Sequence, residues 1–164
     1  MKNNRVILGI DTSNYTTSVA ILTLDGTLIA NLKRPLKVKE GERGLRQSDA
    51  LFSHTVNLPS LMNEAGEYLK DYEVVAIGVS EKPRNVEGSY MPCFLAGVAS
   101  AESISMAMGI PLYRFSHQCG HIMAALYSSE NFDLLDKEFG AFHISGGTTE
   151  LVRVSPDEIG RAHV

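Results

Sequence analysis

The sequence lacks any uncharged apolar run long enough to cross a membrane. The best candidate, Gly88 to Ala101, ends at Glu102. The first five residues, Met-Lys-Asn-Asn-Arg, are followed by only five apolar or small residues before Asp11, which is too few for the apolar core of a signal peptide. We therefore expect a cytoplasmic protein with no membrane segment.

Cysteine is scarce as well. The two cysteines, Cys93 and Cys119, cannot form a disulfide framework, and in a reducing compartment they are most simply free thiols. The net charge of −4, with 44% hydrophobic and 21% charged residues, is ordinary for a soluble globular protein. A chain of 164 residues is long enough for one buried core, or for one domain and the start of another.

One stretch departs from the acidic balance. Residues 33–46 contain six basic and two acidic residues, a net charge of +4. The basic residues are Lys33, Arg34, Lys37, Lys39, Arg43 and Arg46. Such a segment could contact the phosphates of a nucleic acid. Because no aromatic residues are interleaved, a solvated surface loop is the favoured interpretation.

Apolar periodicity and turn residues predict an α/β chain. The expected strands are 5–10, 16–24, 27–32, 74–79, 111–115, 139–145 and 150–154, and the expected helices are 48–70, 94–108 and 117–127. Pro59 should kink the first helix. The continuous apolar run 74–79 is typical of a parallel strand covered on both faces. The order is β-β-β-α-β-α-β-α followed by a hairpin, and the small residues of 94–108 should let that helix pack very close to a neighbouring helix.

Two strand-turn-strand segments share one design. Asp11, Thr12 and Ser13 follow the first strand, and Ser145, Gly146 and Gly147 follow the strand 139–145. Small polar turns of this kind can present backbone amides and hydroxyls to a phosphate. Either turn alone is more typical of an ordinary hairpin. Together, in this order, they indicate duplicated lobes facing one nucleotide.

His117 and His121 are the most informative residues. They lie four positions apart, just past the strand 111–115, so on a helix both imidazoles would project from one face close enough to hold a single metal ion. Such pairs also arise on ordinary helices. Their position favours a site, because α/β proteins place sites in the loops after the carboxyl ends of parallel strands.

These segments resemble the TsaD family, once described as O-sialoglycoprotein endopeptidases or glycoproteases. The resemblance rests on Gly9-Ile10-Asp11-Thr12-Ser13, on His117-x-x-x-His121 followed by Ile122, and on Ser145-Gly146-Gly147. It spans almost all of this chain but only the first half of the family. It implies the actin-like ATPase fold, with a mixed sheet flanked by helices and a ribonuclease-H-like core.

The resemblance also implies an activity in tRNA modification, the transfer of a threonylcarbamoyl group from its adenylate to an adenosine. His117 and His121 would bind one divalent metal, iron or zinc, with an aspartate from a second lobe as third ligand. The metal would polarise the carbamoyl carbonyl. Asp11, Thr12 and Ser13 would lie at one phosphate turn and Ser145, Gly146 and Gly147 at the other, around an adenine nucleotide or threonylcarbamoyl-AMP. His54 is expected to be a packed or interface histidine.

The chain departs from the family around the cofactor. Asn14-Tyr15-Thr16 stands where Cys-Asp-Glu is usual, and Thr148 replaces the histidine after Ser-Gly-Gly. Glu81-Lys82-Pro83-Arg84 replaces a Gly-Pro-Gly loop. A divergent paralogue with altered or lost transfer activity therefore stays open.

Two other functions are alternatives to a transferase. A non-catalytic module resembling TsaB would pair with a TsaB-like protein, or with itself, through the helices 48–70 and 94–108. A metalloprotease is disfavoured, because Gln118 stands where zincins carry a glutamate base. We expect residues 1–135 to form the amino-terminal ribonuclease-H-like lobe and 136–164 the first hairpin of a truncated second lobe, with tRNA as a further partner and no transfer by this chain alone.

Overall fold

The computed structural model describes residues 4–38, 44–144 and 149–156, and the chain divides into two compact units. The first unit comprises Met1–Glu81 and Met91–Arg114, and the second comprises Lys82–Tyr90 and Phe115–Val164. These units differ from the expected lobes 1–135 and 136–164, because the third helix groups with the terminal hairpin. That the hairpin begins a second lobe stays a prediction.

A mixed sheet of five strands forms the centre of the fold, in the order β3-β2-β1-β4-β5. The strands are β1 (Arg5–Asp11), β2 (Thr16–Thr23), β3 (Leu28–Pro35), β4 (Glu73–Lys82) and β5 (Leu112–Ser116). Strands β1, β2 and β3 pair antiparallel, whereas β1 and β4 pair in parallel. The parallel strand expected at 74–79 is therefore confirmed. Asp25 and Gly26 lie in the turn between the antiparallel strands β2 and β3.

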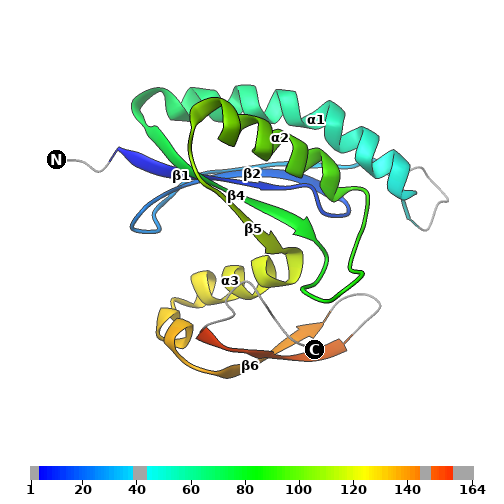
Figure 1. Ribbon diagram of the computed structural model, residues 1–164, viewed down its shortest axis with the longest axis vertical. Coiled ribbons are helices and arrows are strands. Elements are labelled where there is room, and N and C mark those ends of the chain that lie inside the picture. The colour runs from blue at the N-terminus through cyan, green and yellow to red at the C-terminus, as the bar shows by residue number, and fades with distance from the viewer. Residues whose placement is uncertain (1–3, 39–43, 145–148, 157–164) are drawn as a thin grey trace. The chain divides into compact units, whose positions relative to one another are not determined.

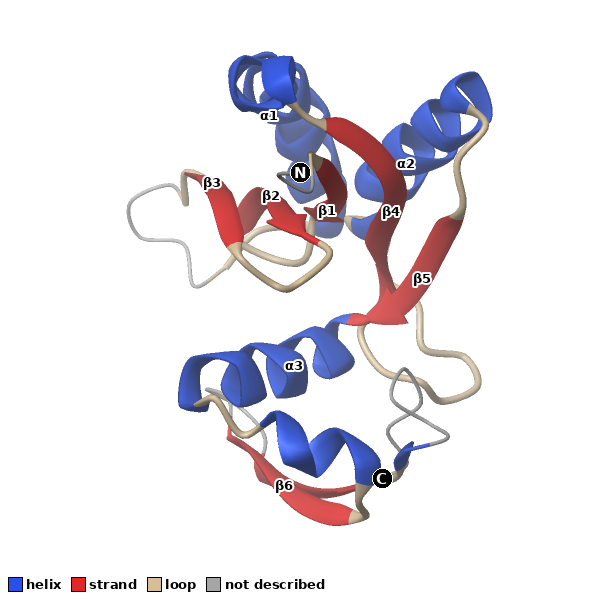
Figure 2. Ribbon diagram, turned by 90° about the vertical axis from the view of Figure 1, so that its left-hand side faces the viewer, coloured by secondary structure: helices blue, strands red, loops and turns tan. Residues whose placement is uncertain are grey.

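Two helices cover one face of this sheet, side by side (Figure 1; Figure 2). They are α1 (Gln47–Tyr68) and α2 (Phe94–Met108). Helix α1 continues through Pro59 and is followed by the short 3-10 helix η1 (Leu69–Asp71). Helix α2 ends at Gly109, whose φ of 66° favours glycine. The predicted bounds of both helices are correct to within two residues.

The core of the first unit lies between the sheet and these helices. Strand β1 alternates, with Val6, Leu8 and Ile10 buried. They pack in one cluster with Leu61 of α1 and Ala101 of α2, neither of which is exposed at all. The small side chains of α2 thus bring its backbone close to β1 as well as to α1. None of the helices in the described residues is long and apolar enough to span a membrane.

The second unit contains one helix and a hairpin. Helix α3 (His117–Ser129) leads through the 3-10 helix η2 (Phe132–Asp136) into β6 (Phe139–Ile144) and β7 (Thr149–Val154). The two strands pair antiparallel, which confirms the predicted hairpin. Ile122 of α3 packs against Val152 and Val154 on one face of the hairpin. This arrangement aligns the first turn of α3 with polar residues of the same hairpin face.

Candidate functional site

The turn between β1 and β2 is held by the carboxylate of Asp11. Its Oδ1 accepts a hydrogen bond from the backbone N–H of Ser13 at 2.7 Å and another from the Ser13 hydroxyl. Its Oδ2 accepts from the Ser80 hydroxyl, near the end of β4, at 2.6 Å. Because β1 and β4 are parallel, their carboxyl ends meet here. The turn closes at Asn14, whose φ of 46° is left-handed.

Thr12 is a structural member of this turn. It is completely buried, its hydroxyl donates to the Cys93 carbonyl at 2.9 Å, and the same oxygen accepts from the Gly97 N–H at 3.1 Å. A Cβ on Gly97 would lie 2.9 Å from this oxygen. The hydroxyl is therefore engaged by α2, and among Asp11, Thr12 and Ser13 no hydroxyl is left to bind a phosphate without giving up a protein partner.

His54 and the two cysteines were also singled out from the sequence. His54 is completely buried, with Nδ1 2.8 Å from the Thr17 hydroxyl, so the structure confirms a packed histidine. Desolvation lowers the pKa of His54, although the Asn14 backbone and the charge of Asp11 oppose this. Burial also raises the pKa of the Cys93 thiol. Cys93 and Cys119 are both buried thiols, which makes them poor nucleophiles.

The histidine pair lies on the first turn of α3. Ser116 caps this helix by accepting from the Cys119 N–H at 3.2 Å, so the helix begins at His117. The Nε2 atoms of His117 and His121 are 2.8 Å apart, and the ring centroids are 4.3 Å apart. The expected common face is therefore present.

At 2.8 Å the two Nε2 atoms are within hydrogen-bond distance of each other, and their spacing can be compared with that of two nitrogen ligands of one metal ion. At a Zn–N distance of about 2.0–2.1 Å and a tetrahedral angle, two ligand nitrogens lie about 3.3–3.4 Å apart. A small rotation of either ring from the observed 2.8 Å separation of the His117 and His121 nitrogens would reach that spacing. Among residues 4–38, 44–144 and 149–156, no three His, Cys, Asp or Glu side chains are grouped to hold a metal. A third ligand is not supplied by this part of the chain.

A cluster of polar side chains near the histidine pair connects the loop at Arg84, helix α3 and the hairpin β6–β7, all in the second unit. Arg84 Nη1 lies 2.5 Å from Glu150 Oε1, and Gln118 Nε2 donates to Glu150 Oε2 at 3.1 Å. Gln118 Nε2 also lies 3.3 Å from Nδ1 of His143, whose ring centroid is 5.5 Å from that of His121. From the sequence, Arg84 was noted only in the loop that differs from the family, and Gln118 only as the residue that replaces a glutamate base. Nothing in the sequence indicated that the two would form a cluster with His143 and Glu150.

The second expected phosphate turn, Ser145, Gly146 and Gly147, lies outside the described residues. The strands that flank it are in register, with Ile144 opposite Thr149. Among the basic residues of 33–46 that the structure describes, Lys33, Arg34, Lys37 and Arg46 are exposed. Arg34 pairs with Glu64 of α1 at 2.7 Å. Lys39 and Arg43 lie outside the described residues.

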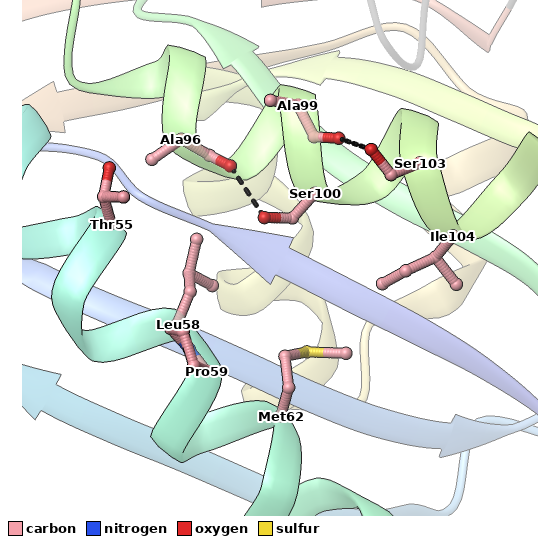
Figure 3. Close-up of a pocket in the computed structure, with 9 residues that line it drawn as sticks. All are labelled: Thr55, Leu58, Pro59, Met62, Ala96, Ala99, Ser100, Ser103 and Ile104. Atoms are coloured by element: carbon pink, nitrogen blue, oxygen red, sulfur yellow. Dashed lines mark hydrogen bonds between the residues drawn. The ribbon is translucent and has the colours of Figure 1, made fainter.

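A groove of about 470 Å³ lies between α1 and α2 (Figure 3). Its walls are mainly apolar, with Leu58 and Met62 from α1 facing Ala96 and Ile104 from α2. Also on α1, the side chains of Phe52 and Val56 are 71% and 58% exposed. Side chains of this size and polarity at an exposed helix surface are typical of a protein interface.

Sequence comparison relates the chain to one kind of enzyme. It is 33% identical over 156 residues to a tRNA N6-adenosine threonylcarbamoyltransferase of Streptococcus suis, covering 94% of this chain and 44% of that protein. It is 30% identical over 151 residues to the enzyme of the same name from Christiangramia forsetii, covering 91% of this chain and 43% of that protein. The chain thus spans less than half the length of the curated relatives it matches. No family profile matches it.

Solved structures share the fold at lower identity. YeaZ from Pseudomonas aeruginosa superposes with a TM-score of 0.52 at 15% identity, over 97% of this chain and 66% of that one. A putative N-acetylmannosamine kinase from Listeria monocytogenes superposes with a TM-score of 0.58 at 15% identity, over 96% of this chain and 49% of that one. These likenesses confirm the expected actin-like ATPase fold. By sequence, the chain is similar to part of the tRNA N6-adenosine threonylcarbamoyltransferases, over less than half of their length.

Proposed function

We propose that this chain is the amino-terminal portion of a transferase that moves a threonylcarbamoyl group from its adenylate to an adenosine of tRNA in the cytoplasm. The observation that carries the proposal is the 2.8 Å separation of the His117 and His121 nitrogens, in a chain homologous to threonylcarbamoyltransferases. Two converging imidazoles on one helical turn are a metal-binding arrangement.

In this proposal His117 and His121 bind one iron or zinc ion, each through its Nε2 lone pair. When bound, the ion supplies Lewis-acid polarisation of the carbamoyl carbonyl. An aspartate from a second lobe, which the hairpin β6–β7 begins, provides the third ligand. Because two protein ligands hold an ion weakly, the chain by itself does not catalyse transfer.

In this proposal the turn at Asp11, Thr12 and Ser13 contacts the nucleotide portion of the adenylate, and the role of Ser145, Gly146 and Gly147, which lie outside the described residues, stays a prediction from the sequence. The Thr12 and Ser13 hydroxyls and the Ser13 N–H already have protein partners, so a phosphate at the first turn has to displace one of these or bind other backbone amides of the turn.

Zinc titration of the isolated chain by calorimetry tests the metal site. His117→Ala and His121→Ala should each weaken zinc binding at least about tenfold, because one of two ligands is lost. Ser128→Ala, an exposed residue on the same helix, is the matched control and should leave the affinity unchanged. Wild-type affinity in both histidine variants would contradict the metal site.

Transfer itself is tested with tRNA and threonylcarbamoyl-adenylate. The chain alone should show no multiple turnover, and extension with the residues encoded downstream should restore it if they contain an aspartate-bearing second lobe. Turnover by the chain alone would refute the requirement for that lobe.

A second candidate is a non-catalytic partner module, similar to the TsaB-like protein YeaZ. The exposed Phe52 and Val56 and the apolar groove between α1 and α2 favour it. The purified chain should then co-elute with a TsaB-like protein, or form a homodimer through these helices. Separate elution at micromolar concentration would count against the interface.

A metalloprotease is the least supported activity. Gln118, after the first histidine, is buried and donates to Glu150, and that carboxylate is paired with Arg84. Neither group is poised to take a proton from water. Peptide cleavage that His117→Ala abolishes would overturn this exclusion.

A further inference from the structure

Four polar side chains of the second unit form a continuous hydrogen-bonded series. Arg84 pairs with Glu150 of β7 at 2.5 Å, Glu150 accepts from Gln118 of α3 at 3.1 Å, and Gln118 reaches His143 of β6 at 3.3 Å. Gln118 is only 1% exposed, and its backbone N–H donates to the Pro83 carbonyl at 3.0 Å. The series therefore has a fixed, largely buried centre.

The charge of Glu150 determines how the Gln118 amide is oriented. As the ion-pair partner of Arg84, Glu150 is a carboxylate that can only accept hydrogen bonds. The NH₂ group of Gln118 must therefore face it, since the reversed amide would set a carbonyl oxygen against a carboxylate oxygen at 3.1 Å. In this orientation Oε1 has no hydrogen-bond partner among the described residues, and the second N–H of the amide points at His143.

This orientation fixes the proton on His143. A neutral imidazole has one N–H and one acceptor nitrogen. Because Gln118 Nε2 donates, the His143 Nδ1 beside it must be the acceptor, and the proton then resides on Nε2. A protonated Nε2 has no lone pair for a metal ion. The ring nevertheless lies next to the histidine pair, with its centroid 5.5 Å from that of His121.

We propose that Gln118 and Glu150 hold His143 as the Nε2–H tautomer, so that His143 is a hydrogen-bond donor beside the metal site and not its third ligand. This role of His143 rests on the proposed function, whereas its tautomer does not. Gln118 and Glu150 are positioning residues, acting through His143.

Nitrogen-15 NMR of the metal-free chain, at a pH where histidines are neutral, measures the tautomer. In the folded chain His143 should have a pyrrole-type Nε2 and a pyridine-type Nδ1, with a tautomer ratio at least about tenfold above that of the urea-unfolded chain. A scalar coupling between the Gln118 amide nitrogen and His143 Nδ1 should accompany it. A protonated Nδ1, or the ratio of the unfolded chain, would overturn the proposal.

Glu150→Gln tests what fixes the tautomer. A neutral amide at position 150 can donate as well as accept, so Gln118 is free to reverse and the His143 ratio should fall toward that of the unfolded chain. Glu138→Gln removes the exposed ion pair with Arg153 in the same unit and should leave the ratio unchanged. A ratio that Glu150→Gln does not change would contradict the role of Glu150, and if that variant does not fold, the coupling measured in the wild type decides.

Zinc added to the wild-type chain separates this inference from the proposed function. The nitrogen signals of His117 and His121 should shift, while His143 keeps its Nε2 proton. Loss of that proton on zinc addition would make His143 a ligand and overturn the inference. If zinc shifts no histidine signal, the proposed metal site fails together with the donor role, but the tautomer measured without metal is unaffected.

Discussion

Gly97 of α2 is the position where the turn at Thr12 is most sensitive to added volume. In Gly97→Ala the new Cβ would lie 2.9 Å from Thr12 Oγ1, 3.3 Å from Thr12 Cγ2 and 3.4 Å from Ile10 Cγ2. Overpacking of this kind costs about 1–3 kcal/mol, and the better helix propensity of alanine returns about 0.5–1 kcal/mol. We expect the free energy of unfolding to fall by about 1 kcal/mol, within a range of about 0–2.5 kcal/mol.

A double-mutant cycle makes this reasoning specific. Thr12→Ala removes both of the atoms that come closest, so Gly97→Ala in that background should be neutral or stabilising. Gly66→Ala, at a helical glycine of the same unit with no atom within 4 Å of its new Cβ, is the control and should stabilise by about 0.5–1 kcal/mol. Urea denaturation measures all four variants. Gly97→Ala that stabilises as much as Gly66→Ala, or that is additive with Thr12→Ala, would refute the close packing.

Three further predictions concern single residues. Because the pKa of buried His54 is lowered, the unfolded chain binds a proton at this residue more readily than the folded chain does. The free energy of unfolding should therefore fall as the pH drops through the ordinary histidine pKa of about 6.5. His54→Gln should flatten this pH dependence, measured by denaturation at a series of pH values, and an unchanged slope would contradict the prediction. Thr12→Val leaves the Gly97 N–H and the Cys93 carbonyl without their buried partner and should cost about 1–3 kcal/mol in urea melts, more than Thr23→Val at an exposed hydroxyl. Phe52→Asp should abolish co-elution with a TsaB-like partner without lowering the thermal midpoint, since Phe52 is 71% exposed; intact co-elution would exclude Phe52 from the interface.

Most of the fold could be predicted from local sequence pattern. The helix 94–108 has the predicted bounds, and every predicted strand is present to within about three residues. Apolar residues alternate along β1 because one face of that strand is more buried than the other. They form a continuous run in β4 because both of its faces are largely covered, and buried positions favour apolar side chains. The short 3-10 helices η1 and η2 were not predicted, because three to five residues carry too little periodicity to be recognised.

The histidine pair could also be predicted, because its geometry is local. Four residues of helix bring His117 and His121 together whatever surrounds them. His54 was correctly expected to be packed, since it lies on the apolar stripe of α1. The hydrogen bonds of the Thr12 hydroxyl could not be predicted from the sequence, because its partners Cys93 and Gly97 are more than eighty residues away along the chain.

The sequence by itself determined the alternation of strands and helices and the pairing of two imidazoles, since each depends on neighbours within one turn or one strand. Only the tertiary structure decided what surrounds those imidazoles. Arg84, Gln118, His143 and Glu150 come from a loop, a helix and two strands, and no spacing in the chain relates them. Hydrogen bonds between distant segments are fixed by packing, and packing therefore determined which nitrogen of His143 carries the proton.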